Sequence, residues 1–183
     1  GLPGKNIKNL CGKPLIAWSI QSGLKSRYLD KVVVSTDYKN IANISKEYGA
    51  EVPFLRPEYL ATDTATTFDV VKHVIGYYQD KENILYDFVV LLEPTSPLRN
   101  DNDIDRMIEK SVEDACDIDS VISIGEVHEH PSIMKKIVGG RYLDNFCENM
   151  EMKYRRQDND VAYFPYGVAY IVKTDSFLKE KTF

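Results

Sequence analysis

Three stretches of the chain carry residue types that bind or activate charged ligands, and the first opens the sequence. In GLPGKN, Gly1 and Gly4 allow backbone conformations that expose successive N–H groups, and Lys5 adds a positive charge. Such a loop could cradle a phosphate. It lacks the G-x-x-x-x-G-K-[ST] pattern, however, and a Gly-Pro turn without a ligand remains the alternative.

The second stretch is LLEPTSPLR, in which two prolines stiffen a loop and direct its polar side chains toward a ligand or solvent. Glu93 is the first polar residue after five apolar ones, which makes it a candidate base or acceptor for a substrate hydroxyl. Arg99 either clamps an anion or pairs with the nearby Asp101 or Asp103.

The third stretch, RPEYLATDTATT, places Arg56 and four threonines before a predicted helix. A helix start with hydroxyls and a nearby arginine suits a nucleotide, but Thr66 with Asp69 also forms a capping box that needs no ligand. Asp37, at the end of a valine run, either contacts a ribose or a metal, or caps the next helix.

Other candidate ligand residues carry a weaker signal. His128 and His130 stand two residues apart, but no acidic partner motif supports a metal site there. Cys11, Cys116 and Cys147 are odd in number and widely spaced, which is typical of reduced thiols in a cytoplasmic protein.

Apolar runs and amphipathic stretches alternate along the chain, which predicts an α/β fold. We expect a three-layer, doubly wound, mainly parallel sheet with right-handed crossovers, whose ligands bind beyond the carboxyl ends of the strands. Strands are predicted at 32–34, 52–55, 87–92, 120–124 and 167–172, and helices at 15–24, 41–48, 66–79 and 103–113.

Residues 125–163 lack a clear period and are predicted to leave the sheet as a lid or a subunit contact; an ordinary long surface loop is the alternative. The length of 183 residues predicts a single domain. A formal charge of −5 argues against a nucleic-acid surface, and no apolar run reaches the ~18 residues of a membrane span.

Taken together, the motifs resemble the CMP-N-acylneuraminate (sialic acid) synthetases, cytidylyltransferases that activate nine-carbon sugar acids. The resemblance covers essentially the whole chain and rests on motifs in family order. They are GLPGKNI, GKPLIAWSI, VVVSTD, RPEYLATDTATT, LLEPTSPLR, HEHP, RRQ and GVAYI.

The resemblance implies that CTP and a 2-keto nonulosonic acid react to give a CMP-sugar and pyrophosphate. It implies catalytic roles for Lys5 and Arg156, with Lys5 neutralising the CTP phosphates. The implied nucleotide-binding residues are Gly4, Lys5, Asn6, Arg56, Thr66 and Thr67, and the implied sugar-binding residues are Glu93, Ser96, Gln157 and Tyr170.

The resemblance also implies a nucleotide-diphospho-sugar transferase fold, a homodimer and a Mg²⁺ cofactor. In the family, residues matching 125–163 reach across the dimer, and an Asp-x-Asp pair that binds the metal would follow Phe183. A first strand normally precedes the opening loop. We therefore expect the chain to be part of a longer polypeptide, with its metal ligands outside these residues.

Two positions depart from the family pattern. Glu93 stands where the family usually has Gln, and a carboxylate there would repel phosphate or a sugar carboxylate by about 1 kcal/mol in a wet site. Tyr166 stands where Asn is usual. Both positions put the identity of the sugar acid in doubt.

Two other functions remain open at this point. One is a non-catalytic nucleotide-binding paralogue, and the other is a related sugar nucleotidyltransferase of the CMP-Kdo synthetase type. A dehydrogenase is disfavoured because no G-x-G-x-x-G follows any predicted strand.

Overall fold

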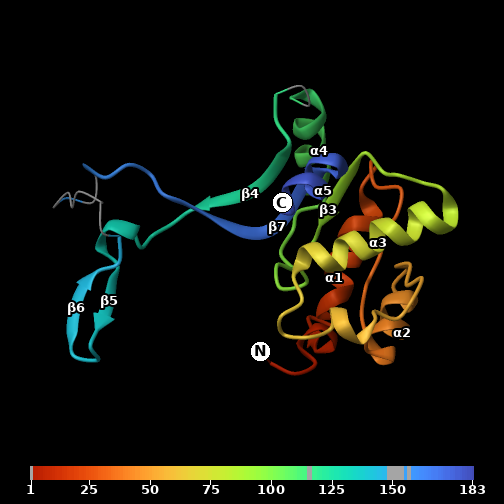
Figure 1. The fold of residues 1–183 in the computed structure, drawn as a ribbon, viewed down its shortest axis with the longest axis horizontal. Coiled ribbons are helices and arrows are strands. Elements are labelled where there is room, and N and C mark those ends of the chain that lie inside the picture. Colours follow the sequence, from red (N-terminus) through yellow and green to blue (C-terminus); the bar gives the residue numbers. More distant parts are fainter. Residues whose placement is uncertain (1, 115–116, 148–154, 156–157) are drawn as a thin grey trace. The chain divides into compact units, whose positions relative to one another are not determined.

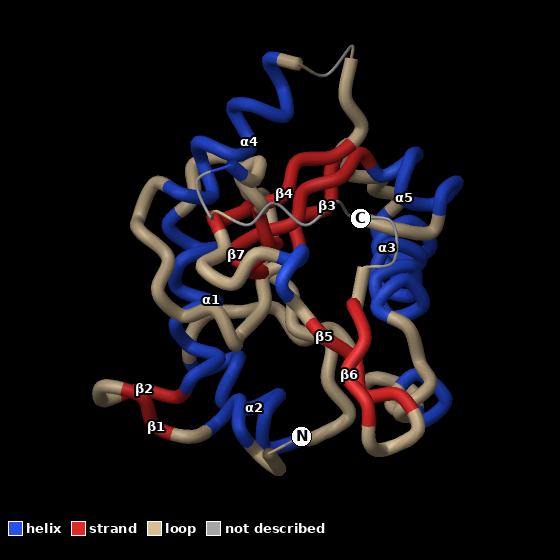
Figure 2. Tube along the Cα trace, turned by 90° about the vertical axis from the view of Figure 1, so that its left-hand side faces the viewer, coloured by secondary structure: helices blue, strands red, loops and turns tan. Residues whose placement is uncertain are grey.

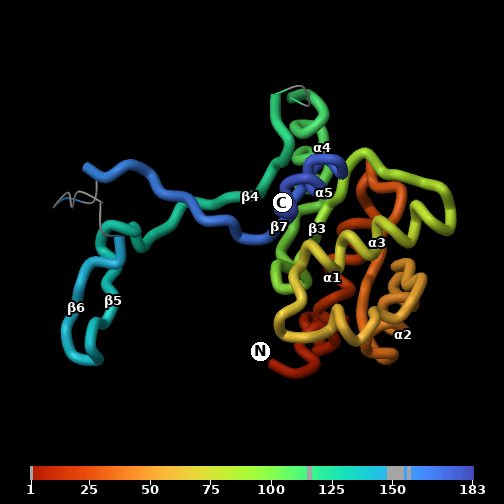
Figure 3. The backbone as a smooth tube through the Cα atoms, viewed as in Figure 1, coloured from red at the N-terminus to blue at the C-terminus, as the bar shows by residue number. Residues whose placement is uncertain are grey.

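The computed structural model describes residues 2–114, 117–147, 155 and 158–183, and it divides into two compact units (Figure 1). The first unit consists of Gly1–Ser123 and Gly167–Phe183, and the second is Ile124–Tyr166. Figure 3 shows how the blue C-terminal segment joins the red-to-green part of the chain within the first unit.

The helices and strands have the following bounds along the chain. The 3-10 helices are η1 (Lys5–Ile7), η2 (Glu58–Leu60) and η3 (Pro131–Ile133). The α-helices are α1 (Leu15–Lys25), α2 (Lys39–Glu47), α3 (Thr67–Glu82), α4 (Asp103–Glu113) and α5 (Thr174–Glu180). The strands are β1 (Asn9–Leu10), β2 (Lys13–Pro14), β3 (Phe88–Leu91), β4 (Ser120–Glu126), β5 (Lys135–Val138), β6 (Tyr142–Asn145) and β7 (Tyr163–Lys173).

The sheet of the first unit has the strand order β3-β7-β4, and β3 pairs antiparallel with β7. Figure 2 shows α1 and α4 on one side of β3 and β7, and α3 and α5 on the other. On the α4 side, Ile104 and Ile108 pack against Ile171 of β7. On the other side, the rings of Phe68 and Phe177 lie 5.1 Å apart and join α3 to α5. Burial of these apolar side chains therefore brings helices to both faces, and the predicted α/β class is confirmed.

The expectation of a mainly parallel sheet is not met by the regular ladders. The pairs β1/β2, β3/β7 and β5/β6 are antiparallel, and a parallel bridge joins Val33 to Glu51. The Glu51 N–H donates to Val32 O, and the Val34 N–H donates to Glu51 O. The next bond of this ladder would need an N–H on residue 53, which is proline. For the same reason the strand predicted at 52–55 is wrong.

Two local predictions, the bounds of α4 and the Thr66 cap, are confirmed because short-range chemistry determines them. Helix α4 has the predicted bounds, and Thr66 is the N-cap of α3, where its side chain accepts a hydrogen bond from the Asp69 N–H. Gly49 follows α2 with a φ of 96°, a conformation that favours glycine at a helix end.

Candidate functional site

The opening loop forms a tight turn that presents a lysine. Gly4 has a φ of 64° and no neighbouring atom within 4 Å of a would-be Cβ, and it is followed by the single turn of η1. The N–H groups of Lys5 and Ile7 donate to the carbonyls of Leu2 and Gly4, so these two amides stabilise the turn. What the loop offers to solvent is the exposed Lys5 side chain.

Asn6 contributes an unusual acceptor beside Lys5. Its side-chain Oδ1 is buried and has no hydrogen-bond partner among the described residues. A buried acceptor without a donor costs about 1–3 kcal/mol, so a ligand that supplied an O–H or N–H there would recover this cost.

Arg56 is fixed at the end of the valine segment. Its backbone N–H donates to Thr36 O at 2.8 Å, and its guanidinium donates to the hydroxyl and the carbonyl of Ser35. Burial lowers the pKa of Arg56, and Asp37 opposes this shift. Asp37 does not cap α2, because the N-cap of that helix is Tyr38 and has no side-chain capping bond.

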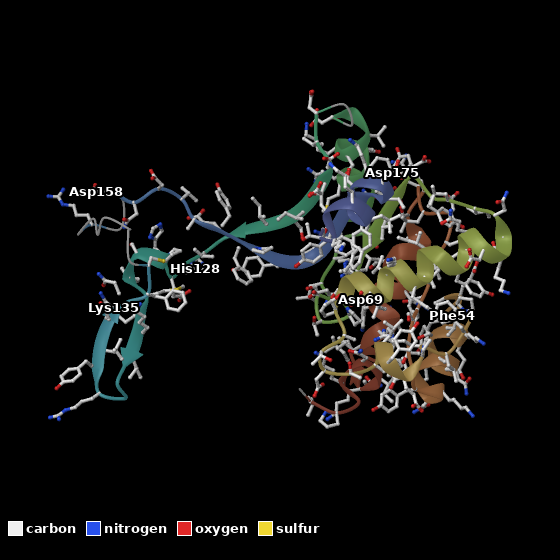
Figure 4. The ribbon with its side chains drawn as sticks, viewed as in Figure 1. Phe54, Asp69, His128, Lys135, Asp158 and Asp175 are labelled. Atoms are coloured by element: carbon white, nitrogen blue, oxygen red, sulfur yellow. The ribbon has the colours of Figure 1, made fainter. Side chains whose placement is uncertain are left out.

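The start of α3 uses one of its two threonines for its own capping. The Thr66 hydroxyl donates to Asp69 Oδ2 at 2.7 Å and accepts from the Asp69 N–H at 3.1 Å, so it is fully engaged. Thr67 is the first residue of the helix and is exposed. Of this pair, Thr67 is the one whose hydroxyl is available to a ligand. Figure 4 labels Asp69 at this helix start.

The proline loop, residues 93–99, follows β3 and packs against Gly167 of β7. Gly167 has a φ of 68°, and a Cβ built on it would lie 2.6 Å from Glu93 Oε2 and 3.4 Å from Ser96 Oγ. The Thr95 hydroxyl lies 3.5 Å from Glu93 Oε2. The absence of a side chain at Gly167 thus allows Glu93 and Ser96, two predicted sugar-binding residues, to lie together.

Arg99 does not pair with Asp101 or Asp103, which was one of its two predicted roles, because these carboxylates accept hydrogen bonds from Lys25 and Asn100. It donates to Ser19 Oγ at 2.8 Å, to Glu93 O at 2.8 Å, and to the carbonyls of Gly167 and Val168. Burial lowers the pKa of Arg99, while Glu93 and Asp103 raise it. The guanidinium therefore ties the proline loop to α1 and β7.

The remaining predicted residues are Tyr170, which lies in β7, and two residues outside the described part of the chain. Tyr170 pairs with Leu91 in the β3/β7 ladder, and its ring lies 6.2 Å from that of Phe183. Arg156 and Gln157 lie outside the described residues.

The candidate histidine metal site is not supported. His130 contacts Ser132 Oγ at 2.7 Å and the Asp160 carbonyl at 3.0 Å, so both ring nitrogens have protein partners. Among the described residues, no three His, Cys, Asp or Glu side chains cluster closely enough to hold a metal ion.

A cleft of about 640 Å³ runs along α3 and reaches the segment just before the start of that helix. Its walls include Tyr59, Thr64, Asp69, His73 and Tyr77. None of Lys5, Arg56, Glu93 and Ser96 lines this cleft. The volume of the cleft alone does not make it the nucleotide site, because the predicted phosphate-binding residue Lys5 is not among its lining residues.

Sequence reasoning missed the importance of Gly167 and the bonding partners of Arg99. Gly167 was visible only as part of the GVAYI motif, and its importance follows from its contact with Glu93. The acceptors of Arg99 are mainly backbone carbonyls, which no side-chain pattern reveals.

Comparison with known proteins shows the relationships of the chain. The family model described as "Cytidylyltransferase" matches residues 1–166. The chain belongs to the cytidylyltransferase family. The N-acylneuraminate cytidylyltransferase of Streptococcus agalactiae serotype V is 36% identical over 100% of this chain, and the chain spans 43% of that relative's length.

Two other relatives of the family are matched over most of their own length. The CMP-N,N'-diacetyllegionaminic acid synthase of Legionella pneumophila is 35% identical over 100% of this chain and 76% of its own. The pseudaminic acid cytidylyltransferase of Campylobacter jejuni (strain 81-176) is 31% identical over 98% of this chain and 75% of its own.

Among solved structures, the CMP:2-keto-3-deoxy-manno-octonic acid synthetase complexed with CTP matches with a TM-score of 0.70. The match covers 98% of this chain and 71% of that one at 18% identity, and it shows a shared fold. Within the described residues, no helix combines the length and apolar character needed to cross a membrane.

Proposed function

We propose that the protein transfers the cytidylyl group of CTP to a 2-keto nonulosonic acid and so produces a CMP-sugar and pyrophosphate. The observation that carries this proposal is the similarity, over the full chain, to relatives named for three different nonulosonic acids. In this reaction the anomeric hydroxyl oxygen bonds to the α-phosphorus of CTP. The bond from that phosphorus to the bridging oxygen breaks, pyrophosphate leaves, and the hydroxyl proton is released to solvent.

We assign the triphosphate to the opening loop and the helix start. Lys5 is exposed and free to place its ammonium on phosphate oxygens, where it would neutralise the leaving pyrophosphate. The unpartnered Oδ1 of Asn6 could accept a hydrogen bond from a donor group of the nucleotide. Gly4, Arg56, Thr66 and Thr67 complete the proposed nucleotide site, with Thr66 acting through its helix cap.

We assign the sugar acid to the proline loop. Glu93 and Ser96 lie together over Gly167, so a carboxylate and a hydroxyl are offered to the same ligand. A carboxylate there favours an acceptor group that donates a hydrogen bond, such as a hydroxyl or an amide N–H, and disfavours a sugar carboxylate. We also propose sugar-binding roles for Tyr170 and Gln157, and a catalytic role for Arg156.

We propose that the reaction uses Mg²⁺ as its cofactor. Among the described residues, no three candidate ligand side chains lie close enough together to hold it. We further propose a three-layer, doubly wound fold for the first unit, and the helices on both faces of β3 and β7 support this proposal (Figure 2).

We propose that the second unit mediates a homodimer. It exposes Ile137, Tyr142, Leu143 and Phe146 by 61–73% each, and such exposed apolar side chains are typical of a partner contact. Sedimentation velocity tests this: the protein should sediment as a dimer, and Leu143→Lys should shift it toward the monomer. A monomer at all concentrations would refute the proposed dimer.

A cytoplasmic location is proposed from the free thiols of Cys11 and Cys147.

The test of the function is CTP-dependent release of pyrophosphate with a panel of acceptors. N-acetylneuraminic, legionaminic and pseudaminic acids and the eight-carbon acid Kdo are supplied one at a time with Mg²⁺. We expect turnover with at least one nine-carbon acid. Turnover with Kdo alone would reassign the enzyme to the octonic acid, and no pyrophosphate release with any acceptor would refute the proposal.

A matched pair of variants tests the role of Lys5. Lys5→Met should raise KM for CTP by about 10- to 100-fold, since a hydrogen bond to a charged group contributes about 1.5–3 kcal/mol. Lys8→Met removes a second exposed lysine three residues away and should change that KM less than about twofold. Equal effects of the two variants would show that net charge, not Lys5, matters.

A further inference from the structure

We infer that Arg99 is a positioning residue that holds the proline loop and Gly167 in the arrangement that receives the sugar acid. This inference rests on the proposed function. Arg99 is the last residue of the loop, its guanidinium bonds α1, β7 and the first residue of the loop, and it is assigned no contact with CTP or with the sugar.

The contacts of Arg99 join three segments that are distant in sequence. Nη1 donates to Ser19 Oγ in α1 at 2.8 Å, and Nη2 donates to Glu93 O at 2.8 Å and to Gly167 O at 3.4 Å. Nε donates to Val168 O. One planar group therefore fixes the first residue of the loop against the two residues of β7 that lie beneath it.

The chemistry of these acceptors explains why an arginine stands here. Each acceptor is a neutral oxygen, and the four of them surround one side chain, which suits the flat, five-donor guanidinium better than an ammonium with three donors. Ser19 Oγ also donates to Glu93 O at 3.2 Å, which extends the network into α1.

The neighbouring carboxylates have other partners, so Arg99 does not form a surface ion pair with them. Asp101 accepts from Lys25 Nζ at 2.7 Å, and Asp103 accepts from the Asn100 N–H at 2.8 Å. The Arg99 charge is thus directed at backbone carbonyls of the loop and of β7.

The consequence for the site follows from the contact between Glu93 and Gly167. The Glu93 side chain fits only because Gly167 presents no Cβ to it, so a small shift of either backbone changes where the carboxylate lies. Arg99 bonds the carbonyls of both residues and so sets their spacing. Loss of this tie should loosen the sugar side of the site and leave the Lys5 loop unaffected.

The experiment compares Arg99→Met and Arg99→Lys with the wild-type protein. KM for the sugar acid and KM for CTP are measured separately, at a temperature where all proteins are folded. We expect Arg99→Met to raise KM for the acceptor at least tenfold with KM for CTP within twofold, and Arg99→Lys to recover part of the loss. Hydrogen exchange should show faster exchange of the Ser96 amide, which donates to Glu93 O at 3.2 Å.

Arg27→Met is the matched control, because Arg27 also ties two segments but bonds Asp105 and Glu109 instead of the proline loop. It should lower stability without separating the two KM values. Proportional changes in both KM values, or unchanged values with only a lower Tm, would overturn the inference while the wild-type activity upheld the proposed function. A wild-type protein without CTP-dependent turnover would refute the proposed function, and the inference with it.

Discussion

Gly167→Ala is expected to destabilise the protein by two separable effects. The first is backbone strain, because a residue with a Cβ at a φ of 68° pays about 1–2 kcal/mol. The second is a collision, because the new Cβ would lie 2.6 Å from Glu93 Oε2 and 3.0 Å from Glu93 Cδ. Overpacking of this kind costs about 1–3 kcal/mol, so the total should be about 2–5 kcal/mol.

Gly12→Ala measures the strain without the collision. Gly12 lies in the first unit with a φ of 93°, and no atom lies within 4 Å of its would-be Cβ. We expect this control to lose only about 1–2 kcal/mol. The double variant Gly167→Ala with Glu93→Ala should be less destabilised than the sum of its two single variants, because the colliding carboxylate is gone.

Urea unfolding followed by the fluorescence of Trp18, the one tryptophan of the chain, measures these free energies in the first unit. The acceptor KM of Gly167→Ala should also rise, since Glu93 must move away. The reasoning would be refuted if Gly167→Ala cost no more than Gly12→Ala, or if removal of the Glu93 side chain gave no relief.

Three further predictions concern acid stability, capping and specificity. Burial raises the pKa of Asp105, but hydrogen bonds from Ser26 and Arg27 outweigh this and hold the pKa below its usual value. The stabilisation from Asp105 should therefore be complete above the unfolded pKa of about 3.9 and be lost as the pH falls through the folded pKa. In urea unfolding measured from pH 2 to 7, Asp105→Asn should lower the unfolding free energy by about 1.5–3 kcal/mol at pH 7 and weaken its decrease at acid pH. An unchanged decrease at acid pH would contradict this. Thr66→Ala should cost about 1 kcal/mol of unfolding free energy by loss of the α3 cap, whereas Thr66→Ser should restore it; equal losses would exclude the cap. Glu93→Gln should change the ratio of kcat/KM values between two nonulosonic acids without changing KM for CTP, and an unchanged ratio would exclude Glu93 as a specificity residue.

The parts of the fold that could be predicted from the sequence depend on short-range chemistry. The period of apolar residues in α4 and the capping pair of Thr66 and Asp69 lie within one or two helical turns, so local spacing determines them. The strand at 52–55 was predicted from its apolar side chains, and it failed because Pro53 removes the N–H that the ladder needs.

In the candidate site, too, some residues could be predicted from the sequence and others could not. Lys5 and Glu93 were identified because their charge stands out beside turns and apolar runs. The function of Arg99 could not be read from its neighbours, because its partners include the Ser19 hydroxyl, 80 residues away, and the carbonyls of Gly167 and Val168, 68 and 69 residues away. Gly167 was missed as a site residue because its role is to leave space for a side chain from another strand.

The crystal structure of the protein with CTP tests the central claim most directly. We predict that the triphosphate lies within hydrogen-bonding distance of Lys5 Nζ, with the cytidine between the opening loop and the start of α3. A triphosphate bound instead in the cleft along α3, beside His73 and Tyr77, would contradict the account.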